Sequence, residues 1–102
     1  MGYFVTPLKT QELLEKTTSF LKERFPNSKV WVFGSYVNGD FKSYSDLDIA
    51  IDLNRPLTIR EFSIIREFIE TLPTLRMVDI IDLQSVTPGF RRIVEHTGQR
   101  IF

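Results

Sequence analysis

Aspartates stand at alternate positions in the segment DLDIAID, residues 46 to 52. If this segment is a strand, its alternate side chains share a face, so Asp46, Asp48 and Asp52 lie opposite the apolar residues between them. Two positions along a strand span less than about 7 Å, so the carboxylates of Asp46 and Asp48 can share one or two divalent ions. The chain has no cysteine and a single histidine. Oxygen ligands alone indicate Mg²⁺ or Mn²⁺, which usually bind substrate phosphates as well.

A candidate phosphate site lies shortly before these acids. Gly34 and Ser35 follow the segment KVWVF, residues 29 to 33, whose β-branched and aromatic residues predict a strand. Backbone N–H groups of the turn and the Ser35 hydroxyl can face a phosphate, and glycine lets it approach closely. The alternative is that Ser35 only serves the turn and that the aspartates form a solvated strand face. The whole order favours the site: a strand, Gly-Ser, ten residues, then Asp-x-Asp opening a second strand.

That order, GSYVNGDFKSYSDLD at residues 34 to 48, resembles the signature of the minimal nucleotidyltransferases in the DNA polymerase β-like nucleotidyltransferase superfamily. The motifs cover residues 28 to 83, and the order of elements extends the resemblance over most of the chain. The resemblance implies that Gly34 and Ser35 contact the β and γ phosphates of a nucleoside triphosphate. It also implies that Asp46 and Asp48 hold the metal ions of that triphosphate.

The family carries a third acid on a later strand, and the segment RMVDIIDL, residues 76 to 83, offers Asp79 and Asp82. These two side chains fall on opposite faces of a regular strand, so only one of them can join the site. The resemblance favours Asp79, the first Asp of the VDIID run, as a ligand of the catalytic metal that helps to deprotonate the attacking hydroxyl. The site predicted in this way is Asp46, Asp48 and Asp79 for catalysis and metal binding, with Gly34 and Ser35 for the phosphates.

The loop after Gly-Ser departs from the family pattern. Members commonly carry an arginine and another basic residue there, whereas this chain has Tyr36 and Asn38, and Lys42 is the nearest cation in the loop. Two interpretations follow. Either Lys42 or an arginine of a partner chain neutralises the phosphates, or the protein is a catalytically weak or silent module that binds its partner.

The resemblance implies a metal-dependent nucleotidyltransferase that transfers AMP from ATP to a hydroxyl and releases pyrophosphate. Larger relatives add a domain that holds the acceptor, so a chain of 102 residues is expected to take its acceptor surface from another protein. Minimal nucleotidyltransferases are commonly paired with small helical HEPN proteins, and many pairs are toxin–antitoxin systems. The resemblance therefore implies an antitoxin that adds AMP to its HEPN toxin within a hetero-oligomer.

The elements that must position these residues can be predicted from spacing. Apolar residues at helical intervals and a following proline predict a helix over 10–25 with Thr10 as its N-cap. Thr58 and Glu61 stand in capping-box order at the start of a second helix over 59–72. Thr87 and Gly98 bracket a third helix.

The strands are expected at 29–33, 46–53 and 76–83, and the last residues, QRIF, as an extended tail on the sheet edge. The order is then α-β-β-α-β-α, which indicates an α+β fold in which helices pack on a small mixed sheet. Residues 1–102 are expected to form a single minimal nucleotidyltransferase domain.

Composition narrows the function classes. The formal net charge is zero, with 13 basic and 13 acidic residues, so no global field draws the chain to nucleic acid, and stable nucleic-acid binding is not expected. No apolar run reaches the roughly 20 residues of a membrane span, and the amino terminus lacks the pattern of a secretory signal. The expected location is the cytoplasm.

Overall fold

The computed structural model describes residues 8–34, 46–74 and 76–102. The helices and strands in these residues follow the order α1 (Thr10–Arg24), β1 (Lys29–Phe33), β2 (Leu47–Asp52), α3 (Ile59–Glu70), β3 (Val78–Asp82), α4 (Pro88–Thr97) and β4 (Gln99–Arg100). The predicted element order is confirmed, and the tail that was expected on a sheet edge is strand β4.

The strands form one mixed sheet in the order β3-β2-β1-β4. β1 runs antiparallel to both β2 and β4, whereas β2 and β3 are parallel and are joined through α3. Parallel neighbours need such a crossover because a short hairpin cannot join them. The predicted α+β class is therefore confirmed.

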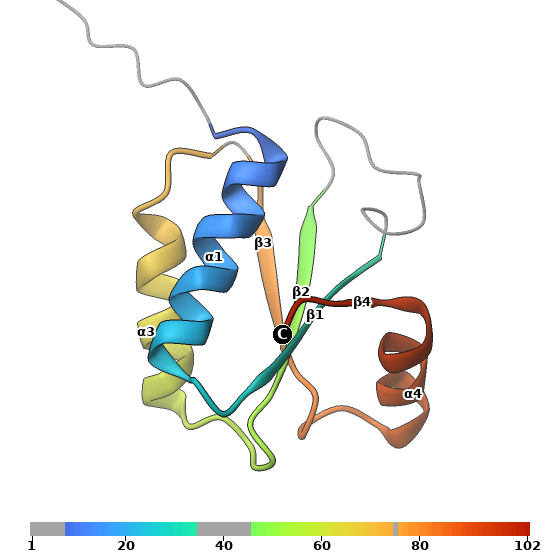
Figure 1. Cartoon of the computed structure of the whole chain (residues 1–102). Helices are drawn as coiled ribbons and strands as arrows, with labels where there is room; N and C mark the ends of the chain where they lie inside the picture. Colours follow the sequence, from blue (N-terminus) through green and yellow to red (C-terminus); the bar gives the residue numbers. More distant parts are fainter. Residues whose placement is uncertain (1–7, 35–45, 75) are drawn as a thin grey trace, which may run out of the picture.

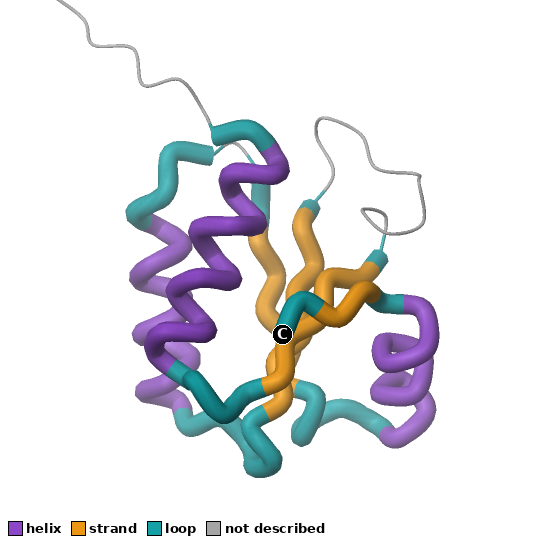
Figure 2. The backbone as a smooth tube through the Cα atoms, in the orientation of Figure 1, coloured by secondary structure: helices purple, strands orange, loops and turns teal. Residues whose placement is uncertain are grey.

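The helices cover the two faces of the sheet unequally. α1 and α3 lie side by side on one face, and α4 lies on the other face, near β1 (Figures 1 and 2). The larger core is on the α1/α3 side and its fully buried members include Leu13, Leu21, Leu47, Ile49 and Ile51. A smaller cluster of Trp31, Ala50, Leu83 and Val94 lies on the α4 side. α4 contacts mainly β1, and on this side of the sheet Ala50 and Asp52 of β2 are buried whereas Asp48 is half-buried.

Local capping explains where the helices begin. The Thr58 hydroxyl accepts a hydrogen bond from the Glu61 backbone N–H (3.1 Å), and the Glu61 carboxylate accepts one from the Thr58 N–H (2.9 Å). Thr87 caps α4 by accepting from the Phe90 N–H. The prediction of Thr10 as the N-cap of α1 is wrong, because the cap is Lys9 and Thr10 is the first helical residue.

Gly98 ends α4 as predicted, although its φ of −78° is an ordinary extended value and not the left-handed one. A Cβ atom at this position would collide with the Val94 carbonyl oxygen and crowd the Val32 carbonyl oxygen. Glycine is needed here because the end of α4 approaches β1 closely. None of the helices that the structure describes is long and apolar enough to cross a bilayer.

Candidate functional site

The amino-terminal ends of β2 and β3 carry Asp46, Asp48 and Asp79, and we call this part of the sheet the acidic end. It is adjacent to Gly34, which follows β1 with a φ of +76°. A Cβ atom at Gly34 would overlap the Asp48 carboxylate, and Phe33 is the register partner of Asp48. A backbone at positive φ and in close approach to a side chain is where glycine is required. The structure therefore brings Gly34 of the predicted phosphate turn next to Asp48.

Asp48 and Asp79 are direct register partners across the parallel pairing of β2 and β3. Neighbouring strands lie about 4.8 Å apart, and register partners direct their side chains to the same face. That face is the α4 side of the sheet, because the alternate residues Leu47 and Ile49 point into the core under α1 and α3. Both aspartates are half-buried. Two partly accessible carboxylates thus stand beside each other on one face of the sheet.

The charges at the acidic end oppose one another. Partial burial raises the pKa of Asp48 above its ordinary value, and the negative charges of Asp79 and Asp46 raise it further. A cation placed between these groups would reverse the effect, because opposite charge favours the ionised carboxylate. Within the described residues neither Asp48 nor Asp79 accepts a hydrogen bond from a side chain or forms an ion pair. The donor chemistry fits a hard divalent cation.

The three acids are not assembled into one finished metal site. In residues 8–34, 46–74 and 76–102, no three His, Cys, Asp or Glu side chains are placed to hold one ion. Asp46 precedes β2 and is exposed, whereas strand register fixes the backbones of Asp48 and Asp79. Asp48 and Asp79 are therefore paired by strand register. Asp46 is not paired in this way, but it lies close enough to raise the pKa of Asp48.

The opposite ends of β2 and β3 carry Asp52 and Asp82, and we call this part the anchored end. Asp82 is only 4% exposed. Its carboxylate accepts hydrogen bonds from the Leu57 N–H (2.8 Å), the Gln84 N–H (3.0 Å) and the Ser85 hydroxyl (2.8 Å). Since Asp82 faces away from Asp79 and its carboxylate is occupied by these donors, Asp79 is the acid that the geometry places at the candidate site.

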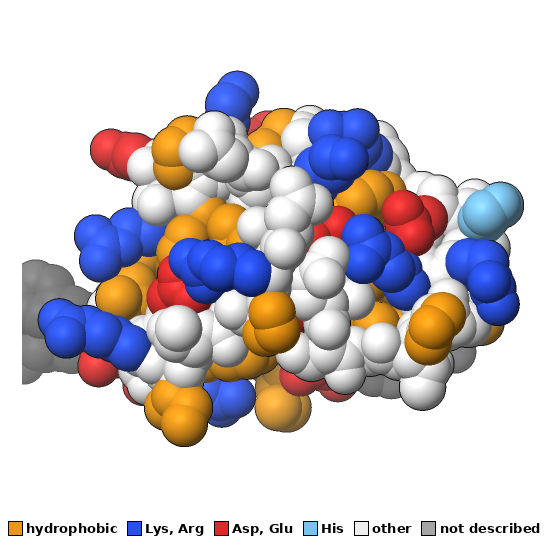
Figure 3. Space-filling view, turned by 90° about the horizontal axis from the view of Figure 1, so that it is seen from below, with side chains coloured by type: hydrophobic (Ala, Val, Ile, Leu, Met, Phe, Trp, Pro, Cys, Tyr) orange, Lys and Arg blue, Asp and Glu red, His pale blue; other side chains and the backbone are white. Residues whose placement is uncertain are grey.

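Asp52 is also structural, and it was only partly predicted. A carboxylate near the end of a strand is expected to be solvated or turn-linked and not to be a fourth metal ligand. The turn link exists, because the Asn54 N–H donates to Asp52 (2.8 Å), but the side chain is 3% exposed and not solvated. Gln84 Nε2 (2.8 Å) and Arg91 Nη2 (2.5 Å) complete its hydrogen bonds. Asp52 thereby ties the end of β2 to α4, and it lies outside the candidate site. Lys and Arg side chains are spread over the surface at this end (Figure 3).

Part of the predicted site lies outside the described residues. Ser35, Tyr36, Asn38 and Lys42 fall in the segment 35–45. The expected role of Ser35 at the phosphates, and the effect of the missing basic residues at 36 and 38, therefore stay predictions.

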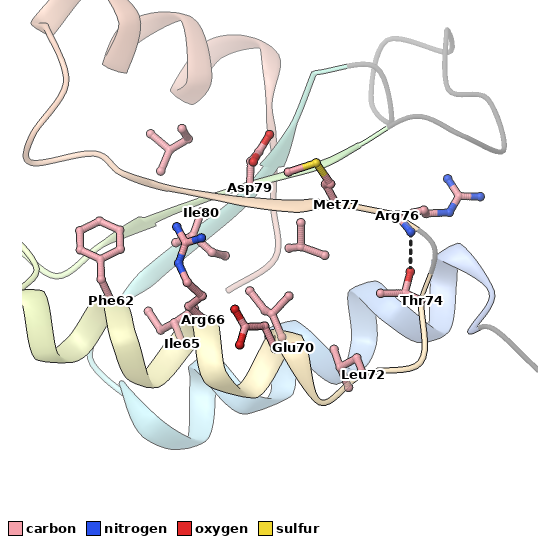
Figure 4. Close-up of a pocket in the computed structure, with 13 residues that line it drawn as sticks. Phe62, Ile65, Arg66, Glu70, Leu72, Thr74, Arg76, Met77, Asp79 and Ile80 are labelled. Atoms are coloured by element: carbon pink, nitrogen blue, oxygen red, sulfur yellow. Dashed lines mark hydrogen bonds between the residues drawn. The ribbon is translucent and has the colours of Figure 1, made fainter. Parts of the chain in front are cut away.

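Sequence reasoning missed a groove next to the acidic end. The groove has a volume of about 390 Å³ and lies between α3 and the outer side of β3 (Figure 4). Phe62, Arg66 and Glu70 of α3 and Ile80 of β3 line it, together with Asp79. The apolar spacing of α3 gave no sign of it, because helical spacing does not show how far α3 lies from the edge of the sheet. Met77 directly precedes β3 and is apolar, yet 65% of it is exposed. Its position in the sequence is the only hint of an uncovered apolar surface near this strand.

Comparison with known proteins identifies the type of domain. A family model described as polymerase beta nucleotidyltransferase matches residues 15–102. Protein adenylyltransferase MntA of Thermococcus cleftensis is 38% identical over 74 residues, which are 72% of this chain and 74% of that protein. Probable protein adenylyltransferase MntA of Haemophilus influenzae is 34% identical over 87 residues, which are 85% of this chain and 75% of that protein.

Solved structures of toxin–antitoxin complexes contain chains with a similar fold. A chain of a toxin–antitoxin structure with AMP-PNP superposes with a TM-score of 0.68 at 22% identity, over 86% of this chain and 71% of that one. A chain from the complex of tri-AMPylated Shewanella oneidensis HEPN toxin with MNT antitoxin gives a TM-score of 0.67 at 22% identity, over 92% and 72%. At these identities the likeness shows the fold.

Proposed function

Because this chain belongs to the polymerase β nucleotidyltransferase family, we propose that it transfers AMP from ATP to a hydroxyl of a HEPN-type partner protein and acts as the antitoxin of that pair. The observation that carries the proposal is the register pairing of Asp48 with Asp79 beside Gly34. Two relatives named protein adenylyltransferase, and a similar fold in a complex with an AMP-modified HEPN toxin, support the same reaction.

We assign a separate role in this reaction to each group of predicted site residues. Gly34 and Ser35 would hold the β and γ phosphates through backbone N–H groups and a hydroxyl. Asp46, Asp48 and Asp79 would bind Mg²⁺ or Mn²⁺, which when bound neutralises the triphosphate and aligns the two reacting oxygens. The raised pKa of Asp48 in the metal-free protein is consistent with this role, because partial burial raises it first and the negative charges of Asp79 and Asp46 raise it further.

The chemical step is a substitution at the α-phosphorus of ATP. The acceptor hydroxyl oxygen forms a bond to that phosphorus, the bond to the oxygen that bridges to the β-phosphorus breaks, and pyrophosphate leaves. Asp79 would take the hydroxyl proton, since it is only half-buried and lies in register with Asp48. The protein contributes mainly position and charge.

A label transfer assay tests the proposal. The purified chain and a HEPN-type partner protein are incubated with Mg²⁺ and ATP that carries ³²P at either the α or the γ position. We expect label on the partner from α-labelled ATP only, because γ-labelled phosphate leaves with pyrophosphate. Asp48→Asn should abolish the label, whereas Glu67→Gln, at an exposed carboxylate of α3, should not.

The assay also separates the alternative reading. A complex that forms without any transfer from α-labelled ATP would make this chain a silent binding module, as the residues Tyr36 and Asn38 first suggested. Label from γ-labelled ATP would indicate a kinase and would overturn AMP transfer.

A further inference from the structure

β3 forms one edge of the sheet among the residues that the structure describes. The Leu47 N–H donates to the Met77 carbonyl, and the Leu83 N–H donates to the Ile51 carbonyl. In a parallel ladder the residues that bond to the neighbour alternate, so residues 79 and 81 also direct their backbone groups to β2. The backbone N–H and C=O groups of Val78 and Ile80 then point outward, away from the sheet.

The outward edge of β3 is poorly covered compared with β2. In β2 all residues except Asp48 are buried, whereas in β3 only Asp82 is buried. The side chains of Val78 and Ile80 face α3 and line the groove of about 390 Å³ with Phe62 and Ile69. An open edge of a sheet normally offers its free N–H and C=O groups as a template for another strand.

The side chains on β3 divide between two sides. Figure 4 shows Ile80 directed toward α3 with Phe62 and Arg66, whereas Asp79 and Met77 lie on the other side of the strand. A strand added to this edge would obey the same alternation. Its residue opposite Asp79 would present its side chain on the face of the candidate site, and the residues before and after it would enter the groove.

We propose that the outer edge of β3 and the groove beside α3 bind an extended segment of the acceptor protein as an additional strand, with the hydroxyl that receives AMP opposite Asp79. The proposal rests on the proposed function, from which it takes the need for a protein hydroxyl at Asp79. It assigns the recognition pattern: a hydroxyl-bearing residue between two apolar residues that enter the groove.

Pairing geometry supports this occupant over a docked helix. Cross-strand neighbours on one face have Cβ atoms about 5 Å apart, so a hydroxyl side chain opposite Asp79 comes within reach of the carboxylate. In the antiparallel arrangement, residues opposite Val78 and Ile80 form the hydrogen-bonded pairs, and the residue opposite Asp79 takes the closer, non-hydrogen-bonded position. A helix has no free backbone groups to satisfy the edge.

Residue-resolved amide hydrogen exchange by NMR tests the edge directly. The chain is compared alone and in complex with the HEPN-type protein, without ATP so that no transfer occurs. We expect the amides of Val78 and Ile80 to slow by at least about tenfold in the complex, because they gain partners. The amides of Asp79 and Ile81 already bond to β2 and should change less. Equal exchange of Val78 and Ile80 in both samples would overturn the proposal.

A matched pair of variants tests the consequence for transfer. Val78→Pro removes an outward N–H at the first residue of β3, where proline is tolerated in an edge strand, and Val78→Ala keeps that N–H while trimming the side chain. We expect Val78→Pro to raise KM for the partner about tenfold relative to Val78→Ala, with kcat and the affinity for an ATP analogue nearly unchanged. Equal KM values for the two variants would contradict the edge pairing.

The two experiments separate this proposal from the proposed function. Protection of Val78 and Ile80 without any AMP transfer would retain the docking edge and reject the reaction. Transfer without protection would retain the reaction and reject the edge. Protection that also appears in the isolated chain at high concentration would identify a second copy of this chain as the occupant, which overturns the assignment to the acceptor.

Discussion

β2 and β3 present aspartates at both ends of the sheet, and the two ends treat the same side chain in opposite ways. At the anchored end, Asp52 and Asp82 are almost fully buried and each accepts three hydrogen bonds. At the acidic end, Asp48 and Asp79 are half-buried, lie in register and repel each other. Buried polar groups with full partners hold a fold together, whereas charges left opposed in an accessible place indicate binding or catalysis.

The largest expected effect comes from the acidic end. Asp48→Asn should lower AMP transfer by at least about 10³-fold, because a carboxylate proposed to bind the metal loses its charge. The free energy of unfolding should stay equal or rise, since repulsion with Asp79 and Asp46 is relieved. Label transfer and urea unfolding measure the two quantities. If Asp48→Asn unfolds as readily as a variant of the anchored end, the distinction between the ends fails.

The next effect concerns stability. Asp82→Ala should lower the free energy of unfolding by about 3 kcal/mol, because three donors at the start of α3 and after β3 lose their acceptor in a buried place. Asp79→Ala on the same strand is the matched control and should change stability by less than about 0.5 kcal/mol. Urea denaturation of both variants measures the difference, and equal losses would contradict it.

A smaller loss is expected at the ion pair of the anchored end. Arg91→Met keeps most of the side-chain volume but leaves the buried Asp52 carboxylate without its cation, which should cost about 2 kcal/mol of unfolding free energy. Arg92→Met, at the exposed neighbouring position, should cost less than about 0.5 kcal/mol. A double variant with Asp52→Asn should lose less than the sum of the two single losses, because both remove the same interaction.

The smallest effect is a pH dependence of the metal-free protein. The pKa of Asp48 is raised on folding, so the folded chain binds more protons than the unfolded chain between the two pKa values. This contribution to stability is present at low pH and is lost as pH rises above about 4 through the raised pKa. Thermal melts with EDTA across this range, with Asp48→Asn as the control, measure it. If the contribution of Asp48 to the free energy of unfolding grew with pH instead, its pKa would be lowered on folding, which would contradict the repulsion from Asp79 and Asp46.

Much of the fold follows from local signals in the sequence. Thr58 with Glu61, and Thr87 with Pro88, fix helix starts through contacts within one turn. The N-cap of α1 was misplaced by one residue because neither Lys9 nor Thr10 makes a side-chain cap bond that would distinguish them. The alternation in β2 predicted that Leu47, Ile49 and Ile51 share a face, and these residues enter the larger core.

The arrangement of the candidate acids was predictable where neighbouring residues of the chain set the geometry. Strand alternation separated Asp79 from Asp82, and the motif chose Asp79. Alternation could not show that Asp52 is buried, because its partner Arg91 lies on a helix far along the chain. The groove beside β3 depends on the distance between α3 and the edge of the sheet, and no local sequence pattern determines that distance.

The parallel pairing of β2 with β3 also has a consequence for folding. Asp48 and Asp79 lie far apart in the sequence and meet only after α3 has crossed over the sheet and the two strands have paired. Such long-range parallel pairing is slow to form compared with helices and hairpins. The two acids therefore come together late in folding. A partly folded chain that already contains its helices would lack the candidate site, so activity would appear only once the sheet is complete.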